Sequence, residues 1–165
     1  QTPPTVEVVT GGKRFIKVDG DVSSTQALAG ASFVVRDQNS EGANYLKVDE
    51  AAKTVTWVAN KADATTFTTQ ADGLVVITGL KYGSYYLEET AAPENYVLLT
   101  NRIQFTVDEH SYGTTEELVA PEKVPNKHKG TLPSTGGKGI YLYLGSGTLI
   151  LIIVGLYFMK RKETR

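Results

Sequence analysis

The chain has 165 residues, a net charge of −1 at pH 7 and no cysteine. This length accommodates one domain of ordinary size with short flanking segments, and without cysteine no disulfide can reinforce that domain. Residues 136–165 carry five basic residues against one acidic residue, so the rest of the chain is net acidic. A net acidic domain disfavours nucleic acid as a partner.

Residues 1–11 open with Gln1-Thr2-Pro3-Pro4 and have the composition of a linker. No signal peptide precedes them in this sequence. We therefore expect the chain to be the C-terminal piece of a longer exported protein, with the linker leading from an upstream region.

From residue 12 onward, short runs of β-branched and aromatic residues alternate with turns rich in Gly, Asp and Asn. No helical period is evident before residue 138. We predict strands at 13–19, 31–37, 45–48, 54–58, 65–69, 74–78, 84–90, 96–99 and 102–107, with a last strand within 116–124. Short strands at this spacing predict an antiparallel β-sandwich.

The first predicted strand contains a lysine whose orientation the pattern leaves open. Alternation places Phe15, Lys17 and Asp19 on one face. Ile16 and Val18 lie on the other face, and if they face the core, Lys17 points to solvent.

The predicted strand at 84–90 has a carboxylate on an apolar face. Alternation places Tyr85, Leu87 and Glu89 on the same side. A carboxylate in that position is costly unless it is protonated or paired. Glu88 faces the other way and is expected to be solvated.

The run from Tyr85 to Tyr96, Tyr-Tyr-Leu-Glu-Glu-Thr-Ala-Ala-Pro-Glu-Asn-Tyr, resembles the E-box Y-x-L-x-E-T-x-A-P-x-G-Y of Cna B-type domains. These domains occur in Gram-positive pilins and adhesins. The one departure is Asn95 in place of glycine, and Asn tolerates a left-handed backbone. Residues 15–19, 28–33 and 123–127 also resemble the family. The likeness covers roughly residues 12–128 and implies an Ig-like (Cna B-type) antiparallel β-sandwich.

The resemblance further implies an intramolecular isopeptide bond between Lys17 and Asn126, with Glu89 assisting its formation. Burial disfavours the ammonium form of a lysine, which makes the amine nucleophilic. A protonated Glu89 would then donate a hydrogen bond to the Asn126 side-chain carbonyl and polarise it. Asn101 is an alternative partner to Asn126, and Lys13 is an alternative to Lys17.

The C-terminal residues predict a membrane anchor. Residues 140–159 are apolar and uncharged, and as a helix they would span about 30 Å of hydrocarbon. The basic residues that follow predict a cytoplasmic stop-transfer tail: Lys160, Arg161, Lys162 and Arg165.

A pentapeptide before this apolar run resembles the L-P-x-T-G sorting signal of Gram-positive cell-wall proteins. It consists of Leu132, Pro133, Ser134, Thr135 and Gly136. The resemblance implies that a sortase cysteine attacks the Thr135–Gly136 peptide bond and holds Thr135 as an acyl-enzyme. An amine on a neighbouring pilin subunit or on the peptidoglycan precursor then accepts the Thr135 carboxyl group.

These features predict five regions: a linker at 1–11, a β-sandwich at 12–128, a linker with the sorting motif at 129–137, a transmembrane helix at 138–159 and a basic tail at 160–165. The expected location is the cell wall and cell surface, as part of a fimbrium, after a membrane-held stage. No cofactor and no metal site are predicted, because the two histidines, His110 and His128, lie in predicted loops and no cysteine accompanies them.

The first functional hypothesis is a structural pilus subunit hardened by the internal bond. The alternatives are a stalk or ligand-binding domain of a monomeric wall-anchored adhesin, and a tethered enzyme whose catalytic domain lies upstream. Sortase and neighbouring subunits, or the wall precursor, are the expected partners. The sequence does not identify a host ligand, an acceptor lysine, or a shaft, tip or base role.

Overall fold

The computed structural model describes residues 9–130, and the predicted sorting motif, membrane helix and tail lie outside them. Its strands are β1 (Thr10–Asp19), β2 (Ser32–Arg36), β3 (Tyr45–Asp49), β4 (Thr54–Val58), β5 (Phe67–Thr68), β6 (Leu74–Lys81), β7 (Gly83–Ala91), β8 (Ile103–Val107) and β9 (Glu122–Asn126), with one 3-10 helix, η1 (Lys61–Asp63). Within this part of the chain, no helix is long and apolar enough to cross a membrane.

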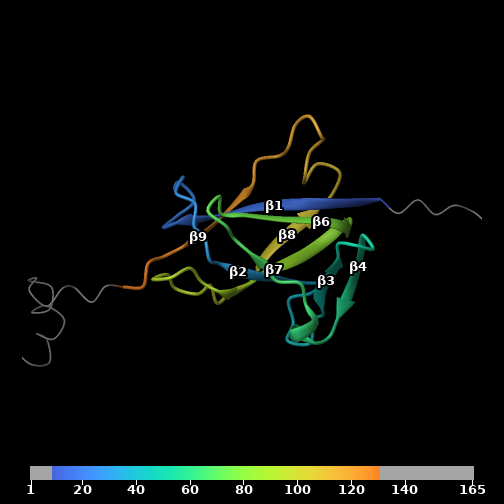
Figure 1. Ribbon diagram of the computed structural model, residues 1–165, viewed down its shortest axis with the longest axis horizontal. Helices are drawn as coiled ribbons and strands as arrows, with labels where there is room; N and C mark the ends of the chain where they lie inside the picture. The colour runs from blue at the N-terminus through green and yellow to red at the C-terminus, as the bar shows by residue number, and fades with distance from the viewer. Residues whose placement is uncertain (1–8, 131–165) are drawn as a thin grey trace, which may run out of the picture. The chain divides into compact units, whose positions relative to one another are not determined.

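The strands form two sheets that face each other (Figure 1). One sheet has the order β6-β1-β9, and the other has the order β4-β3-β2-β7-β8 with β5 paired to β2. The predicted all-β sandwich is therefore confirmed. One pair departs from the antiparallel prediction: β1 runs parallel to β9, with Asp19 opposite Asn126.

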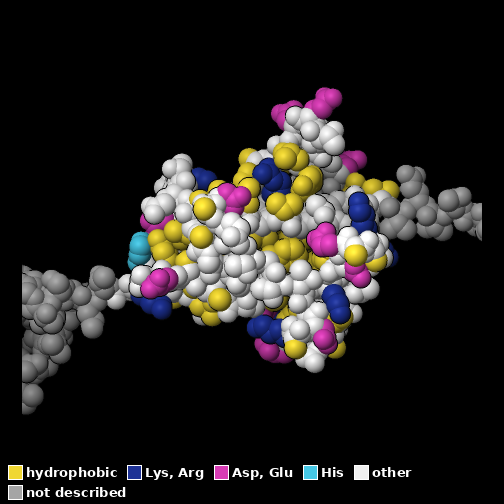
Figure 2. Space-filling view, in the orientation of Figure 1, with side chains coloured by type: hydrophobic (Ala, Val, Ile, Leu, Met, Phe, Trp, Pro, Cys, Tyr) yellow, Lys and Arg dark blue, Asp and Glu magenta, His cyan; other side chains and the backbone are white. Residues whose placement is uncertain are grey.

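The core lies between the two sheets. Phe15 on β1 packs edge-on against Phe105 on β8, with ring centroids 5.1 Å apart. The other buried residues of this core cluster are Ala31, Phe33, Val35, Leu46, Val75, Ile77, Leu80, Leu87, Val107 and Val124. Over the face in Figure 2, acidic and basic side chains are interspersed rather than gathered by sign.

The alternation pattern left open whether Lys17 faces the core or solvent, and the orientation of β1 decides this. Phe15 and Lys17 both point into the sandwich, and each is only 1% exposed. Val18 is buried as well, because the segment after β1 folds back over it and Ala27 forms a bridge with it. Lys17 is thus a core residue rather than a surface lysine.

The glycine position of the E-box keeps its turn although asparagine occupies it. Asn95 has φ +68°, the left-handed conformation that asparagine tolerates better than most residues. The Tyr96 amide donates to the Pro93 carbonyl at 3.1 Å and closes the turn. The expectation that Asn95 preserves this turn is confirmed.

The prediction of a strand at 96–99 is wrong. Instead of pairing with β8, this segment forms a single bridge between Tyr96 and His128. The Val97 amide donates to the Lys127 carbonyl at 2.9 Å, and the Leu99 amide donates to a side chain. The Val97 and Leu99 amides therefore bond to residues outside the segment, which a local strand pattern does not reveal.

Candidate cross-linking site

Three polar side chains that the sequence analysis singles out meet inside the core. Lys17 projects from β1, Asn126 from the adjacent β9, and Glu89 from β7 in the facing sheet. The side chains of Lys17 and Glu89 have no exposed surface, and Asn126 is 0% exposed. Buried polar groups are tolerated only when they are paired, and each of these three pairs with the other two.

The contacts within this triad are direct. Lys17 Nζ lies 3.3 Å from Glu89 Oε1 and donates a hydrogen bond to Asn126 Oδ1. Asn126 Nδ2 lies 3.0 Å from Oε1 and 3.1 Å from Oε2 of Glu89. The lysine amine, the asparagine amide and a carboxyl group that can carry a proton are therefore in mutual contact.

The surroundings of Lys17 lower its pKa. Burial lowers the pKa of Lys17 to about 8, although the Glu89 carboxylate acts in the opposite direction. The Phe33 ring, which pairs across the sheet with Glu89, lies 5.8 Å from Nζ. A lysine that titrates near pH 8 offers a neutral amine far more readily than a solvated one does.

The hydrogen bonds differ from the predicted arrangement in one respect. We expected Glu89 to donate to the carbonyl of Asn126. Instead, the carbonyl oxygen accepts from Lys17, and both Glu89 oxygens lie against Nδ2, which donates to them. The carboxyl group therefore faces the nitrogen that would leave, because β7 approaches Asn126 from the opposite sheet.

The sequence analysis missed one contributor, the backbone of Leu99. Its amide donates to Glu89 Oε2 at 2.7 Å, so the segment after the E-box fixes the carboxyl group from outside the sandwich. Any residue except proline provides this donor, and no side-chain signal could have identified it.

Glu88 was predicted to be solvated, but its carboxylate lies in a cluster of ion pairs. Its carboxylate lies 2.8 Å from Arg36 Nη1, 2.7 Å from Arg102 Nε and 3.9 Å from Lys61 Nζ. Burial would raise the pKa of Glu88, yet the two guanidinium groups lower it overall. Arg36 also donates to the Ala43 carbonyl at 2.7 Å, so this cluster holds the 37–44 loop against β7.

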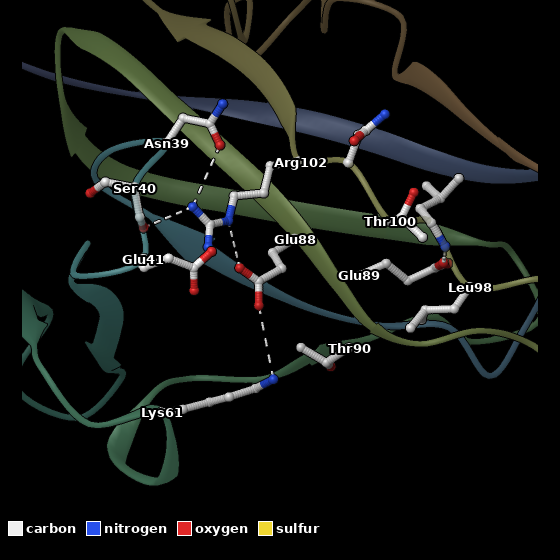
Figure 3. Close-up of a pocket in the computed structure, with 12 residues that line it drawn as sticks. Asn39, Ser40, Glu41, Lys61, Glu88, Glu89, Thr90, Leu98, Thr100 and Arg102 are labelled. Carbon is white, nitrogen blue, oxygen red and sulfur yellow. Dashed lines mark hydrogen bonds and ion pairs between the residues drawn. The ribbon is translucent and has the colours of Figure 1, made fainter.

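An open cleft of about 820 Å³ lies beside this cluster (Figure 3). In Figure 3, Arg102 reaches toward Asn39, Ser40 and Glu88, while Lys61 approaches Glu88 from the other side. The charged groups of Arg102, Lys61 and Glu88 are thus bound to one another. We assign them to holding the loops rather than to binding a ligand.

The two alternative cross-link residues lie elsewhere. Lys13 Nζ is 3.1 Å from Glu122 on the half-exposed side of the β1–β9 pair. Asn101 is an exposed residue at the cleft. Neither residue joins the buried triad. In residues 9–130, no group of three or more histidine or acidic side chains is arranged to hold a metal ion.

The fold and the anchor motif define a domain type of bacterial surface proteins. The chain belongs to the SpaA family of prealbumin-like fold domains, whose model matches residues 12–120. The model of the LPXTG cell wall anchor motif matches residues 124–164. The first match ends before β9, so Asn126 lies beyond it although the structure places this residue in the same sandwich.

Solved structures and a curated protein give the same result. The crystal structure of the group B streptococcus pilus 2b backbone protein is 35% identical, with a TM-score of 0.61, over 75% of this chain and 43% of that one. The full-length major pilin RrgB from Streptococcus pneumoniae is 26% identical, with a TM-score of 0.60, over 74% and 31%. The trypsin-resistant surface T6 protein of Streptococcus pyogenes serotype M6 is 25% identical over 96% of this chain and 32% of its own length.

The chain therefore spans about a third of the curated relative and less than half of these pilins. The anchor motif and the surface relatives place it at the cell wall and cell surface. It is a pilin-like surface protein with a sortase anchor motif.

Proposed function

We propose that this chain is the C-terminal part of a Gram-positive pilus subunit with two covalent linkages. Sortase joins Thr135 to a neighbouring subunit or to the peptidoglycan precursor, and Lys17 joins Asn126 through an intramolecular isopeptide bond. The observation that carries the internal bond is the buried contact of Lys17, Glu89 and Asn126. The anchor match and the similarity to pilin backbones support the external one.

The chemistry follows from the positions of the atoms. Lys17 gives a proton to Glu89 Oε1, 3.3 Å away, and becomes a neutral amine. The amine attacks Cγ of Asn126, forming the new carbon–nitrogen bond. Glu89 then protonates Nδ2, 3.0 Å away, as the bond between Cγ and Nδ2 breaks. The Glu89 carboxylate then takes one of the two protons left on Nζ, so that the new amide keeps one. It passes this proton to the departing ammonia, which leaves as ammonium, and Glu89 returns to its carboxylate form.

The acid role of Glu89 in this scheme differs from simple polarisation of a carbonyl. Because its two oxygens face Nδ2 and one also faces Nζ, the same carboxyl group can accept a proton from Nζ and donate it to Nδ2. The Leu99 amide holds Oε2 in that position. No cofactor or external base is required.

Intact mass measurement of residues 1–135 tests the internal bond. The wild type should be lighter than its sequence mass by one ammonia, about 17 Da, whereas Glu89→Ala should have the full sequence mass. The matched control is Glu88→Ala, which removes the adjacent carboxylate but leaves the triad, and it should still lose ammonia. Full sequence mass in the wild type would refute the internal bond, and peptide mapping would identify the joined residues.

Polymerisation requires a separate test. Cells that express the entire protein should yield ladders that resist sodium dodecyl sulfate, and Thr135→Ala should abolish the ladders. A single wall-linked band from the wild type would instead support the alternative, a stalk or ligand-binding domain of a monomeric adhesin.

A further inference from the structure

The residues that follow Asn126 are held against the E-box turn. The Val97 amide donates to the Lys127 carbonyl at 2.9 Å, and the Lys129 amide donates to the Asn95 carbonyl at 2.8 Å. Between these two bonds, Tyr96 and His128 form an antiparallel bridge, and their rings lie 4.3 Å apart. This arrangement fixes the chain immediately beyond the residue that would be cross-linked.

Asp19 connects the same segment to β1. His128 Nε2 lies 2.9 Å from Asp19 Oδ1. Burial raises the pKa of the Tyr96 hydroxyl, and the hydrogen bond and negative charge of Asp19 raise it further. Asp19 stands opposite Asn126 in the parallel ladder, and the next amide, Gly20, donates to the Asn126 carbonyl at 2.9 Å. The three side chains therefore surround the end of β9.

The interaction between Asp19 and His128 is electrostatic. Although Nε2 is close, Asp19 Oδ1 is buried and has no hydrogen-bond partner among the described residues. A buried carboxylate oxygen without a donor is costly unless a positive charge compensates it. Imidazole supplies that charge only when it is protonated.

We propose that Asp19, Tyr96 and His128 form a clasp that positions Asn126 for reaction with Lys17, and that the clasp is tighter when the imidazole is charged. The proposal rests on the proposed isopeptide bond. The titratable groups against the ring are Asp19 from β1 and Tyr96 from the segment after β7, with Lys127 and Lys129 adjacent in sequence. These are positioning residues, because none of them contacts the reacting atoms.

The solvent exposure of His128 and Asp19 limits how much their ion pair can change the rate of bond formation. The side chains of His128 and Asp19 are 61% and 26% exposed, so solvent screens most of their attraction. An ion pair of this kind changes an equilibrium by about two- to fivefold. We expect the rate of bond formation to change by a similar factor.

The rate of ammonia loss by the full chain tests the clasp. The chain is synthesised in a cell-free system with detergent and sampled over time for intact mass at pH 5.5 and pH 8.5. At pH 5.5, Asp19→Asn and His128→Gln should react about two- to fivefold more slowly than the wild type. At pH 8.5 the His128→Gln rate should match the wild-type rate. His110→Gln, the control at the other histidine, should match the wild type at both pH values.

The outcomes separate the clasp from the bond itself. Equal rates for the wild type and both clasp variants at pH 5.5 would overturn the clasp. A slowing of His128→Gln that is the same at both pH values would also overturn it, because that result indicates a structural role without charge. Absence of ammonia loss in every chain, including the wild type, would instead refute the proposed bond.

Discussion

Mechanical extension gives a sharp test of the internal bond. The N-terminal end of the chain leads into β1, and the C-terminal end leaves from β9, which pairs with β1 in parallel. A pulling force on the two ends therefore acts on adjacent strands in shear. With Lys17 joined to Asn126, the force bypasses everything between these two residues.

The structure determines how much further the protein without the bond should extend under force than the bonded protein. Lys17 and Asn126 are separated by 109 positions in the sequence. A fully extended chain spans about 3.3–3.6 Å per residue, so release of this segment adds about 360–390 Å. The bonded protein should extend only through the residues outside the loop, which span about a quarter of that length.

Single-molecule force spectroscopy on residues 1–135, held at both ends, measures this difference. The perturbed protein is Lys17→Met/Glu89→Gln, a double variant that removes both buried charges together and so leaves neither one uncompensated. It should show an unfolding step of about 360–390 Å that the wild type lacks. The matched control is Lys13→Met, which alters the other lysine of the β1–β9 pair and should behave as the wild type.

Extension of the wild type as far as the double variant would refute the internal bond. A long unfolding step in Lys13→Met, with no such step in the wild type, would show that the bond uses Lys13 and not Lys17. Both outcomes are readily distinguished, because the predicted step exceeds the length of the folded strands many times over.

Three further predictions concern the same site. The free energy of unfolding, measured by guanidinium titration, should fall by about 4.7 kcal/mol in Lys17→Met/Glu89→Gln, the value for a cross-link closing a loop of about a hundred residues; a loss below about 1 kcal/mol would contradict a covalent link. The rate of ammonia loss should fall about tenfold per pH unit above pH 8, because the pKa of Lys17 is about 8 and deprotonation removes the proton that Glu89 must carry; a rate that rises through pH 8 would show that the free amine alone limits the reaction. Leu99→Pro removes the amide that holds Glu89 and should slow the bond about tenfold or more, whereas Leu99→Ala keeps the amide and should react normally, with intact mass over time as the measurement.

Local patterns in the sequence predicted most of the strands and the burial of Glu89. In β7, for example, Leu87 and Glu89 share one face, as alternation indicates, and both are buried. The segment at 96–99 has the same apolar character as a strand but bonds to residues near 127 and to Glu89. Alternation describes which side chains share a face, and it contains no information about distant backbone partners.

The site could be predicted only in part for the same reason. A family resemblance suggested Lys17 and Asn126, whereas their adjacency depends on a parallel pairing of the first and last strands that leaves no local signal. The burial of Arg36 in β2 was missed because its partner, Glu88, lies 52 positions away in the sequence. The Leu99 amide was missed because a backbone donor is independent of residue type.

The parallel pairing of β1 with β9 also has a consequence for the order of events during export. A chain that crosses the membrane N-terminus first delivers β1 to the outside at the start and β9 near the end. Until β9 arrives, Lys17 lacks the neighbouring strand that carries Asn126, and the three-stranded sheet cannot close. The long separation between these partners delays completion of the fold until almost the whole domain has been translocated. If the proposed bond between Lys17 and Asn126 forms, this topology allows it only after most of the domain has crossed the membrane, when the chain no longer has to remain unfolded for export.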